Sequence, residues 1–268
     1  MFLRFEAELN GGKFSEIAPE LVLIDVIERE AAMDMVTAPY ANKPGQRVSS
    51  NLRTSLAVQL VYLINTQDIV RRAEIANLIT AWGKNGGLLQ VNYRPGLQLD
   101  VMMDTPPTIN SALRWTQELT LTFTAHLQPY WMDAEAVQET IETTPKSDGS
   151  EYQSLFASIR MGGNVDHVPV DCSIINVGDT DLTNVRVDIG STSITLVGMT
   201  VPVGGTIMMD YANGLLSIYN LSDTAESYLY ARTPQSSDDL LAEVGYNNVY
   251  IESNTQVQVL LFGRGWWM

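Results

Sequence analysis

Residues 118–125, ELTLTFTA, alternate strictly between polar and apolar side chains, and this alternation constrains the fold more than any other stretch. The apolar set comprises Leu119, Leu121, Phe123 and Ala125. Successive side chains of a strand point to opposite faces, so the segment predicts a half-buried β-strand with a row of threonines outward. Pro129 interrupts the pattern, and we interpret residues 115–131 as the end of a first domain.

Length and composition favour two domains over one. The chain has 268 residues, 45% of them hydrophobic, which is enough for a sizeable core. The N-terminus does not resemble a signal peptide, and no run approaches the roughly 20 apolar residues that a membrane span needs. Cys172, the only cysteine, lies in an alternating pattern typical of a buried core residue. We therefore expect a soluble protein made in a reducing cytosol.

The net charge of −15 is unevenly distributed. Residues 1–134 hold 14 acidic and 11 basic side chains, a net charge of −3, whereas residues 135–268 hold 17 and 5, a net charge of −12. Nucleic-acid binding needs clustered cations, so the second half is a poor candidate for it. The first half is close to neutral and can pack against copies of itself without strong repulsion.

The first half predicts an α+β domain: an antiparallel sheet with one helix and an extended arm. Residues 3–9 form a hairpin that turns at Asn10-Gly11-Gly12, and the buried strands are residues 21–27 and 54–64. Residues 30–53 have no core pattern, so we expect them to form an arm or extended hairpin that leaves the domain. Residues 88–103 form a second hairpin with Pro95-Gly96 in a type II turn.

The helix is predicted from Asp68 to Trp82, with an apolar stripe of Ile75, Leu78, Ile79 and Trp82. Arg71 and Arg72 occupy the same face one turn earlier. Their stems either cover the sheet edge while their heads reach water, or they meet a carboxylate of a neighbouring subunit.

The second half predicts an all-β domain over residues 151–268, after a helical or flexible acidic linker at 133–150. Short alternating runs recur between turn signals: VPVDCSII, VRVDI, SITLV, TIMMD, LLSIY, YLYAR, NVYIE and VQVLLF. Evenly spaced short strands indicate a β-sandwich. We expect residues 236–241, SSDDLL, to form one helical turn capped by its own serines.

The order of these segments resembles the distal tail protein of long-tailed phages that infect Gram-positive bacteria. The matching pieces of the first half are Ile69–Trp82, Leu89–Gly96, Trp115–Ala125 and Pro129–Trp131. Those of the second half are SIINVGDTDLTNV, ITLVGMTVPVGGTIMMDYANG, SSDDLL and the closing FGRGWWM. They are packing and turn patterns, and none of them is a catalytic signature.

The resemblance implies a structural protein of a virion or prophage tail tip, made in the bacterial host cytoplasm. Such proteins form hexameric rings that join the tail tube protein to the tail hub, the baseplate and the receptor-binding proteins. Residues 1–132 would form the ring, and residues 30–53 would embrace the neighbouring subunit. The second domain would be a galectin-like or carbohydrate-module-like jelly-roll sandwich. The expected subunit interface comprises Met33, Met35, Tyr40, Pro44, Arg47, Arg71 and Arg72.

Catalytic chemistry has little support in the sequence, which also implies no cofactor and no metal. Only His126 and His167 are available for a triad, and the motifs of P-loop enzymes, zinc proteases, α/β-hydrolases and calcium loops are missing. With 31 carboxylates, counting alone leaves a glycosidase-type acid pair open. We therefore weigh three hypotheses: an assembly protein, a carbohydrate-binding module for host adhesion, and a cell-wall hydrolase.

Aromatic side chains give the strongest case for a ligand. Trp266, Trp267 and Tyr246 are the candidate carbohydrate contacts, because sugars stack on exposed rings. The alternative is structural: Tyr228 and Tyr230 pack across strands, and the two tryptophans are buried against the other domain.

Overall fold

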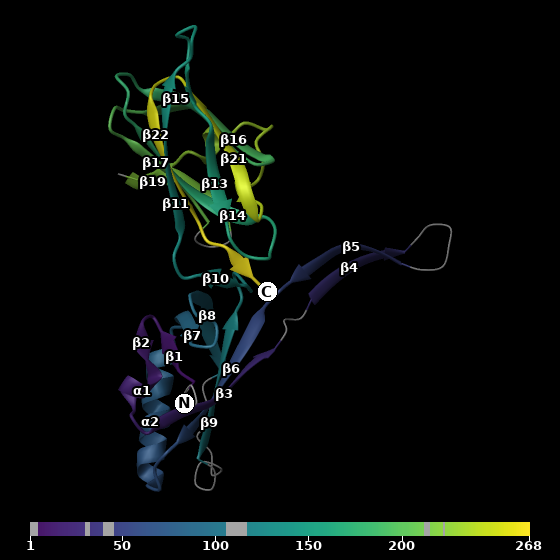
Figure 1. The fold of residues 1–268 in the computed structure, drawn as a ribbon, viewed down its shortest axis with the longest axis vertical. Coiled ribbons are helices and arrows are strands. Elements are labelled where there is room, and N and C mark those ends of the chain that lie inside the picture. The colour runs from purple at the N-terminus through teal and green to yellow at the C-terminus, as the bar shows by residue number, and fades with distance from the viewer. Residues whose placement is uncertain (1–4, 30–32, 40–45, 106–116, 212–214, 222) are drawn as a thin grey trace. The chain divides into compact units, whose positions relative to one another are not determined.

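The computed structural model describes residues 5–29, 33–39, 46–105, 117–211, 215–221 and 223–268, with the backbone alone between 33 and 53. The chain is mostly β and divides into two compact units, Met1–Trp131 and Met132–Met268 (Figure 1). The predicted arrangement of a helix-bearing β unit followed by an all-β unit agrees with these elements.

The first unit is built on one antiparallel sheet in the order β2-β1-β7-β8-β9-β6-β3. Its elements are β1 (Ala7–Leu9), β2 (Gly12–Lys13), α1 (Phe14–Ile17), β3 (Leu21–Arg29), β4 (Met33–Pro39), β5 (Gln46–Arg53), β6 (Leu56–Ile64), α2 (Ile69–Gly83), β7 (Gly87–Val91), β8 (Leu97–Thr105) and β9 (Glu118–Ala125). β10 (Trp131–Asp133) spans the boundary between the units.

The predicted alternation of β9 is confirmed, since all four apolar side chains of that strand are buried. Thr124 is buried as well, although the pattern places it outward. β9 pairs with β6, whose Leu56, Val58, Leu60, Tyr62 and Ile64 are also buried. Both predicted hairpins are present, and the turn before β8 has Gly96 at a φ of 77°, as position i+2 of a type II turn requires.

Helix α2 begins after Asp68, whose carboxylate accepts the backbone N–H groups of Val70 and Arg71. Its buried residues are Arg72, Ile75, Ala76, Ile79 and Gly83. The predicted stripe was wrong at Leu78, which is 47% exposed. The side chains of Phe14 in α1 and Trp82 pack edge to face with ring centroids 4.7 Å apart, and this contact helps to fill the core beside α2.

The second unit forms a sheet in the order β16-β15-β21-β12-β11-β22-β14-β17-β18-β19. Its elements are β11 (Val137–Pro145), β12 (Tyr152–Ser154), β13 (Ala157–Met161), β14 (Val168–Asn176), β15 (Leu182–Ile189), β16 (Thr192–Val201), β17 (Thr206–Asp210), β18 (Ser217–Asn220), β19 (Asp223–Ser227), η2 (Leu229–Ala231), β20 (Leu241–Ala242), β21 (Gly245–Ser253), β22 (Val257–Gly263) and β23 (Trp266–Trp267). One buried cluster contains Val187 and Ile251 from the paired strands β15 and β21. The same cluster contains Val170 and Leu261 from the paired strands β14 and β22. The strands therefore enclose a core, as in a sandwich.

Three local predictions for this unit were wrong. Residues 137–145, expected in a helical or flexible linker, form β11, which pairs with β22 and β12. Residues 229–231, expected within a strand, form the 3₁₀ turn η2. Ser236 and Ser237 do not cap a helix, because their hydroxyls accept the backbone N–H groups of Thr195 and Ser193 in β16.

Candidate interaction surfaces

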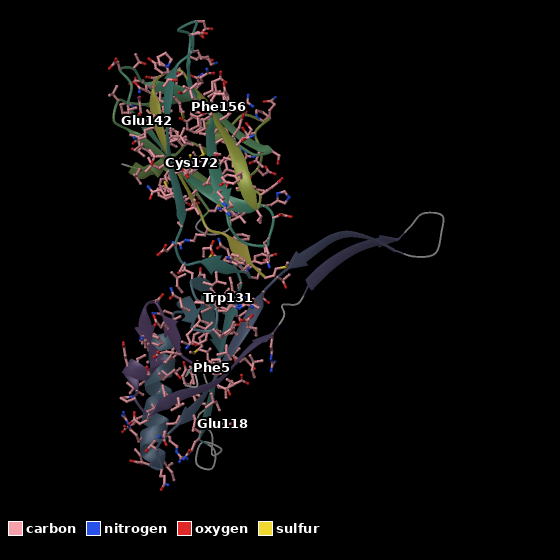
Figure 2. All side chains as sticks on the ribbon, in the orientation of Figure 1. Phe5, Glu118, Trp131, Glu142, Phe156 and Cys172 are labelled. Carbon is pink, nitrogen blue, oxygen red and sulfur yellow. The ribbon has the colours of Figure 1, made fainter. Side chains whose placement is uncertain are left out.

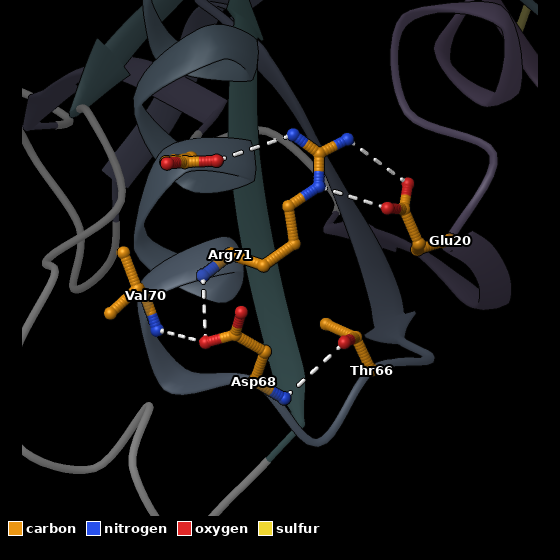
Figure 3. A network of polar contacts seen from close by, with 6 residues as sticks. Glu20, Thr66, Asp68, Val70 and Arg71 are labelled. Atoms are coloured by element: carbon orange, nitrogen blue, oxygen red, sulfur yellow. Dashed lines mark hydrogen bonds and ion pairs between the residues drawn. The ribbon is translucent and has the colours of Figure 1, made fainter.

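Arg71 is held by carboxylates of its own chain. Its Nε donates to Glu20 Oε1 at 2.9 Å, and its Nη1 donates to Glu74 Oε2 at 3.3 Å (Figure 3). The Arg71 guanidinium holds the pKa of the Glu20 carboxyl below its usual value. This network ties the first turns of α2 to the loop before β3, so the structure already provides one partner for a residue predicted at the subunit interface.

The contact of Arg72 with a carboxylate of a neighbouring subunit stays a prediction. Within its own unit the side chain is buried, and its Nε donates to the Thr66 carbonyl oxygen at 2.7 Å. A buried guanidinium needs such acceptors to offset its lost hydration, which explains why it can occupy the apolar face of α2.

In the segment predicted to form an arm, β4 and β5 form a separate two-stranded antiparallel sheet. Met33, Met35 and Arg47 lie in these strands, where Met33 pairs with Arg53 and Met35 pairs with Asn51. Tyr40 and Pro44, also predicted at the interface, lie outside the described residues. The arm follows β3 and precedes β6, so it is rooted in two neighbouring strands of the sheet.

A cluster that the sequence did not reveal lies at the arm's root. Two guanidinium nitrogens of Arg94 contact the two carboxylate oxygens of Glu28, at 2.8 and 2.9 Å, and the Tyr93 hydroxyl also donates to Glu28. Arg94 in turn lies over the Trp131 ring, 5.4 Å from its centroid. Glu28 is the penultimate residue of β3, so this cluster fixes the strand from which the arm departs.

The two C-terminal tryptophans are used inside the second unit. Trp266 packs against the core cluster, and Trp267 Nε1 donates to Asp133 Oδ1 at 2.8 Å. Asp133 Oδ2 accepts the Gly265 N–H at 3.1 Å, and Arg264 donates to the Asp133 carbonyl oxygen at 2.8 Å. We call the contacts of Asp133 with residues 264–267 the C-terminal clasp. Both rings are half-buried, which leaves them less surface for a sugar than the exposed Tyr246 has.

Tyr246, the third candidate carbohydrate contact, is 78% exposed on β21. The Arg160 guanidinium lies 5.5 Å from its ring centroid. The same region contains Phe156, which the sequence reasoning did not single out and which is fully exposed. The sequence could have revealed that Tyr246 and Tyr250 point outward. Side chains alternate between the two faces of a strand, and the apolar Val249 and Ile251 of β21 point inward.

The residues considered for catalysis occupy unremarkable settings. His126 Nε2 lies 2.9 Å from Asp104 Oδ1 at the sheet surface, and His167 is exposed with a φ of 64°. Burial raises the pKa of the Cys172 thiol, which suits a core residue. In the described part of the chain, no three His, Cys, Asp or Glu side chains gather as a metal site would require.

One carboxylate pair stands out in the second unit. Asp171 on β14 lies opposite Asp210 on β17, next to the Cys172–Met209 pair. Burial, together with the charge of Asp210, raises the pKa of Asp171. Both carboxylates serve their own unit, since Asp171 accepts the Tyr211 N–H at 3.0 Å and Asp210 accepts the Tyr219 hydroxyl at 2.6 Å.

No protein-family model and no curated protein matches this chain. Solved structures do. The Dit protein of phage SPP1, described as a paradigm of the hub adsorption apparatus in phages infecting Gram-positive bacteria, aligns with a TM-score of 0.62 at 12% identity, over 97% of this chain and 98% of that one. The chain has the fold of a phage distal tail protein.

A chain of the phage P2 baseplate in its activated, Ca-bound conformation has the same fold. It aligns with a TM-score of 0.51 at 9% identity, over 99% of this chain and 98% of that one. The likeness to the distal tail fold that the sequence resemblance implied is thus confirmed along nearly the whole chain. None of the helices in the described ranges is long and apolar enough to cross a membrane.

Proposed function

We propose that the chain is a structural component of a phage or prophage tail tip, forming a ring that connects the tail tube to the hub, the baseplate and the receptor-binding proteins. The observation that carries this proposal is the distal-tail fold along nearly the whole chain. The protein works by assembly and catalyses no reaction. Six copies in the ring is the number that the resemblance implies.

Each part of the chain has a role in this proposal. Residues 1–132, with a nearly neutral surface charge, form the ring, and the β4–β5 arm embraces the next subunit. The Glu28–Arg94 pair holds the arm's root in a defined direction. The acidic second unit, a galectin-like or jelly-roll sandwich, keeps the assembly soluble and faces outward.

Native mass spectrometry of the full chain tests the ring, with a closed oligomer as the expected result. Deleting residues 34–50 and closing the gap with an Asn-Gly turn should leave both units folded while shifting the oligomer toward monomer. Circular dichroism and urea unfolding of the same sample provide the folding control. An unchanged oligomer after the deletion would show that the arm does not hold the subunits together, and a monomeric parent chain at high concentration would contradict the ring.

A second candidate function is carbohydrate binding by the second unit during host adhesion. It is favoured by the exposed rings of Tyr246 and Phe156. The two functions are compatible, since one uses the first unit and the other uses the second.

A further inference from the structure

Three aromatic side chains share the outer face of β13 and β21. Tyr246 and Tyr250 point outward from β21, on the opposite side from the buried Val249 and Ile251. Phe156 immediately precedes β13, and since Ala157 pairs with Val249, Phe156 lies at the level of Tyr250. We call Phe156, Tyr246 and Tyr250 the aromatic face. With about 3.3 Å per strand residue, Tyr246 and Tyr250 are about 13 Å apart along β21.

Phe156 is held in a conformation that folding alone does not favour. Its φ is 35°, in the left-handed region, where a bulky side chain is a genuine outlier. Its side chain is 107% exposed, so no burial of the ring offsets this backbone strain (Figure 2 labels its position). Strained residues of this kind cluster at sites that bind or react, which makes this ring a candidate contact.

Fixed polar groups surround the aromatic face. Ser158 and Asn248 are paired between β13 and β21 and are both exposed. Asp188 lies opposite Tyr250 on the next strand, where it accepts a hydrogen bond from Arg186 Nε at 2.8 Å and from the Ser193 hydroxyl at 2.6 Å. These side chains offer hydroxyl, amide and carboxylate groups in positions that the strands define.

The chemistry of this face favours one class of ligand. The outward residues of β13 and β21 include Ser158, Asn248 and Glu252, and serine and glutamate are depleted at protein interfaces, although the exposed aliphatic residues Leu155 and Val244 lie beside the face. The net charge of −12 on residues 135–268 repels polyanions. Neutral sugars fit both conditions, because their C–H faces stack on aromatic rings while their hydroxyl groups bond to amides and carboxylates.

From this geometry we infer that the aromatic face binds a neutral oligosaccharide, with Phe156 and Tyr246 as stacking residues. The binding surface is built on strands, so it suits an extended chain of several sugar rings. This inference rests on the second candidate function and identifies its site. It also moves the contact away from Trp266 and Trp267, whose surfaces serve the C-terminal clasp.

The test uses the full chain and three variants on an immobilised panel of neutral glucose, galactose, rhamnose and N-acetylglucosamine oligomers, with poly(glycerol phosphate) as the anionic probe. Tyr246→Ala and Phe156→Asn should weaken binding by about tenfold or more, since aromatic anchors dominate such contacts. Asparagine tolerates the left-handed backbone, so Phe156→Asn should melt no lower than the parent. Tyr230→Ala is the matched control, because Tyr230 is also exposed, at 69%, but lies on η2.

Binding of at least one neutral oligomer by the parent and by Tyr230→Ala, with loss in the other two variants, supports the inference. Three results overturn it: no neutral oligomer binds the parent, the anionic probe alone binds, or Tyr230→Ala loses as much affinity as Tyr246→Ala. Native mass spectrometry of the same samples separates the two functions. A closed ring that binds no sugar refutes only the aromatic face, and a monomer that binds sugar through it refutes only the ring.

Discussion

The C-terminal clasp makes a quantitative prediction about the two terminal tryptophans. Trp267 Nε1 donates to the Asp133 carboxylate, which also accepts the Gly265 N–H. A hydrogen bond to a charged acceptor contributes roughly 1.5–3 kcal/mol, and both bonds end on the half-buried Asp133 carboxylate, where solvent screening reduces their combined contribution. We therefore expect Asp133→Ala, which removes both acceptor oxygens, to lower the free energy of unfolding by about 2–4 kcal/mol.

A double-mutant cycle with Trp267→Phe isolates the contact between the two side chains. Phenylalanine keeps most of the ring and removes the Nε1 donor, so the single change should cost about 1–2 kcal/mol. The coupling energy should be about 1–2 kcal/mol, because the two residues share one hydrogen bond. Asp133→Asn is the matched control, since it keeps an oxygen acceptor and loses the charge. Urea unfolding followed by tryptophan fluorescence measures the four proteins of the cycle and the control, and a coupling energy below about 0.5 kcal/mol would refute the clasp.

Two further predictions concern single groups. Arg71 lowers the pKa of Glu20 from 4.5 in the folded state, so the pair stabilises the protein above that pH and loses its effect as the pH falls through the lowered pKa. The urea midpoints of the parent and of Glu20→Gln, measured at pH 7, 5 and 3, should therefore become more similar as the pH falls. A difference in midpoint that stays constant with pH would contradict this. Burial raises the pKa of Cys172, so iodoacetamide at pH 8 should modify it only in urea, as mass spectrometry would show; rapid labelling of the native chain would contradict its burial.

Strands with an apolar residue at every second position could be predicted from the sequence. In β6, β9, β14 and β22 most inward residues are aliphatic or aromatic, and burial of these side chains decides the conformation. Residues 30–53 lack a core pattern, which predicts an excursion from the domain, and in the described residues β4 and β5 pair only with each other.

β11 could not be predicted this way, because its inward face carries little hydrophobic signal. Ile141 and Thr143 are its only buried residues. The Thr143 hydroxyl accepts the Val257 N–H at 2.9 Å and donates to the Val257 carbonyl oxygen at 3.2 Å. The hydrogen-bond partner of Thr143 lies 114 residues away in the sequence, so local periodicity does not predict that this polar residue is buried. The sequence pattern therefore predicts an acidic linker instead of a strand.

The candidate surfaces also combine features that strand periodicity predicts with features that depend on long-range contacts. The outward position of Tyr246 follows from strand parity, but the strain at Phe156 depends on how β12 passes into β13. The Glu28–Arg94 pair joins residues 66 positions apart, and the clasp joins Asp133 to residues more than 130 positions later. Local pattern gives no information on such pairs, and only the folded chain brings them together.

The Asp171–Asp210 pair has one property of an enzyme's acid pair, a carboxyl with a raised pKa. A general acid needs a raised pKa and free access to substrate, and burial supplies the first of these for Asp171. Its Oδ1 is used to hold the backbone of Tyr211, and Asp210 holds the Tyr219 hydroxyl. These bonds fasten the end of β17 to β14 and β18, a sufficient reason to keep two carboxylates side by side despite their repulsion. The pair therefore stabilises the second unit through the bonds that it makes within the sheet.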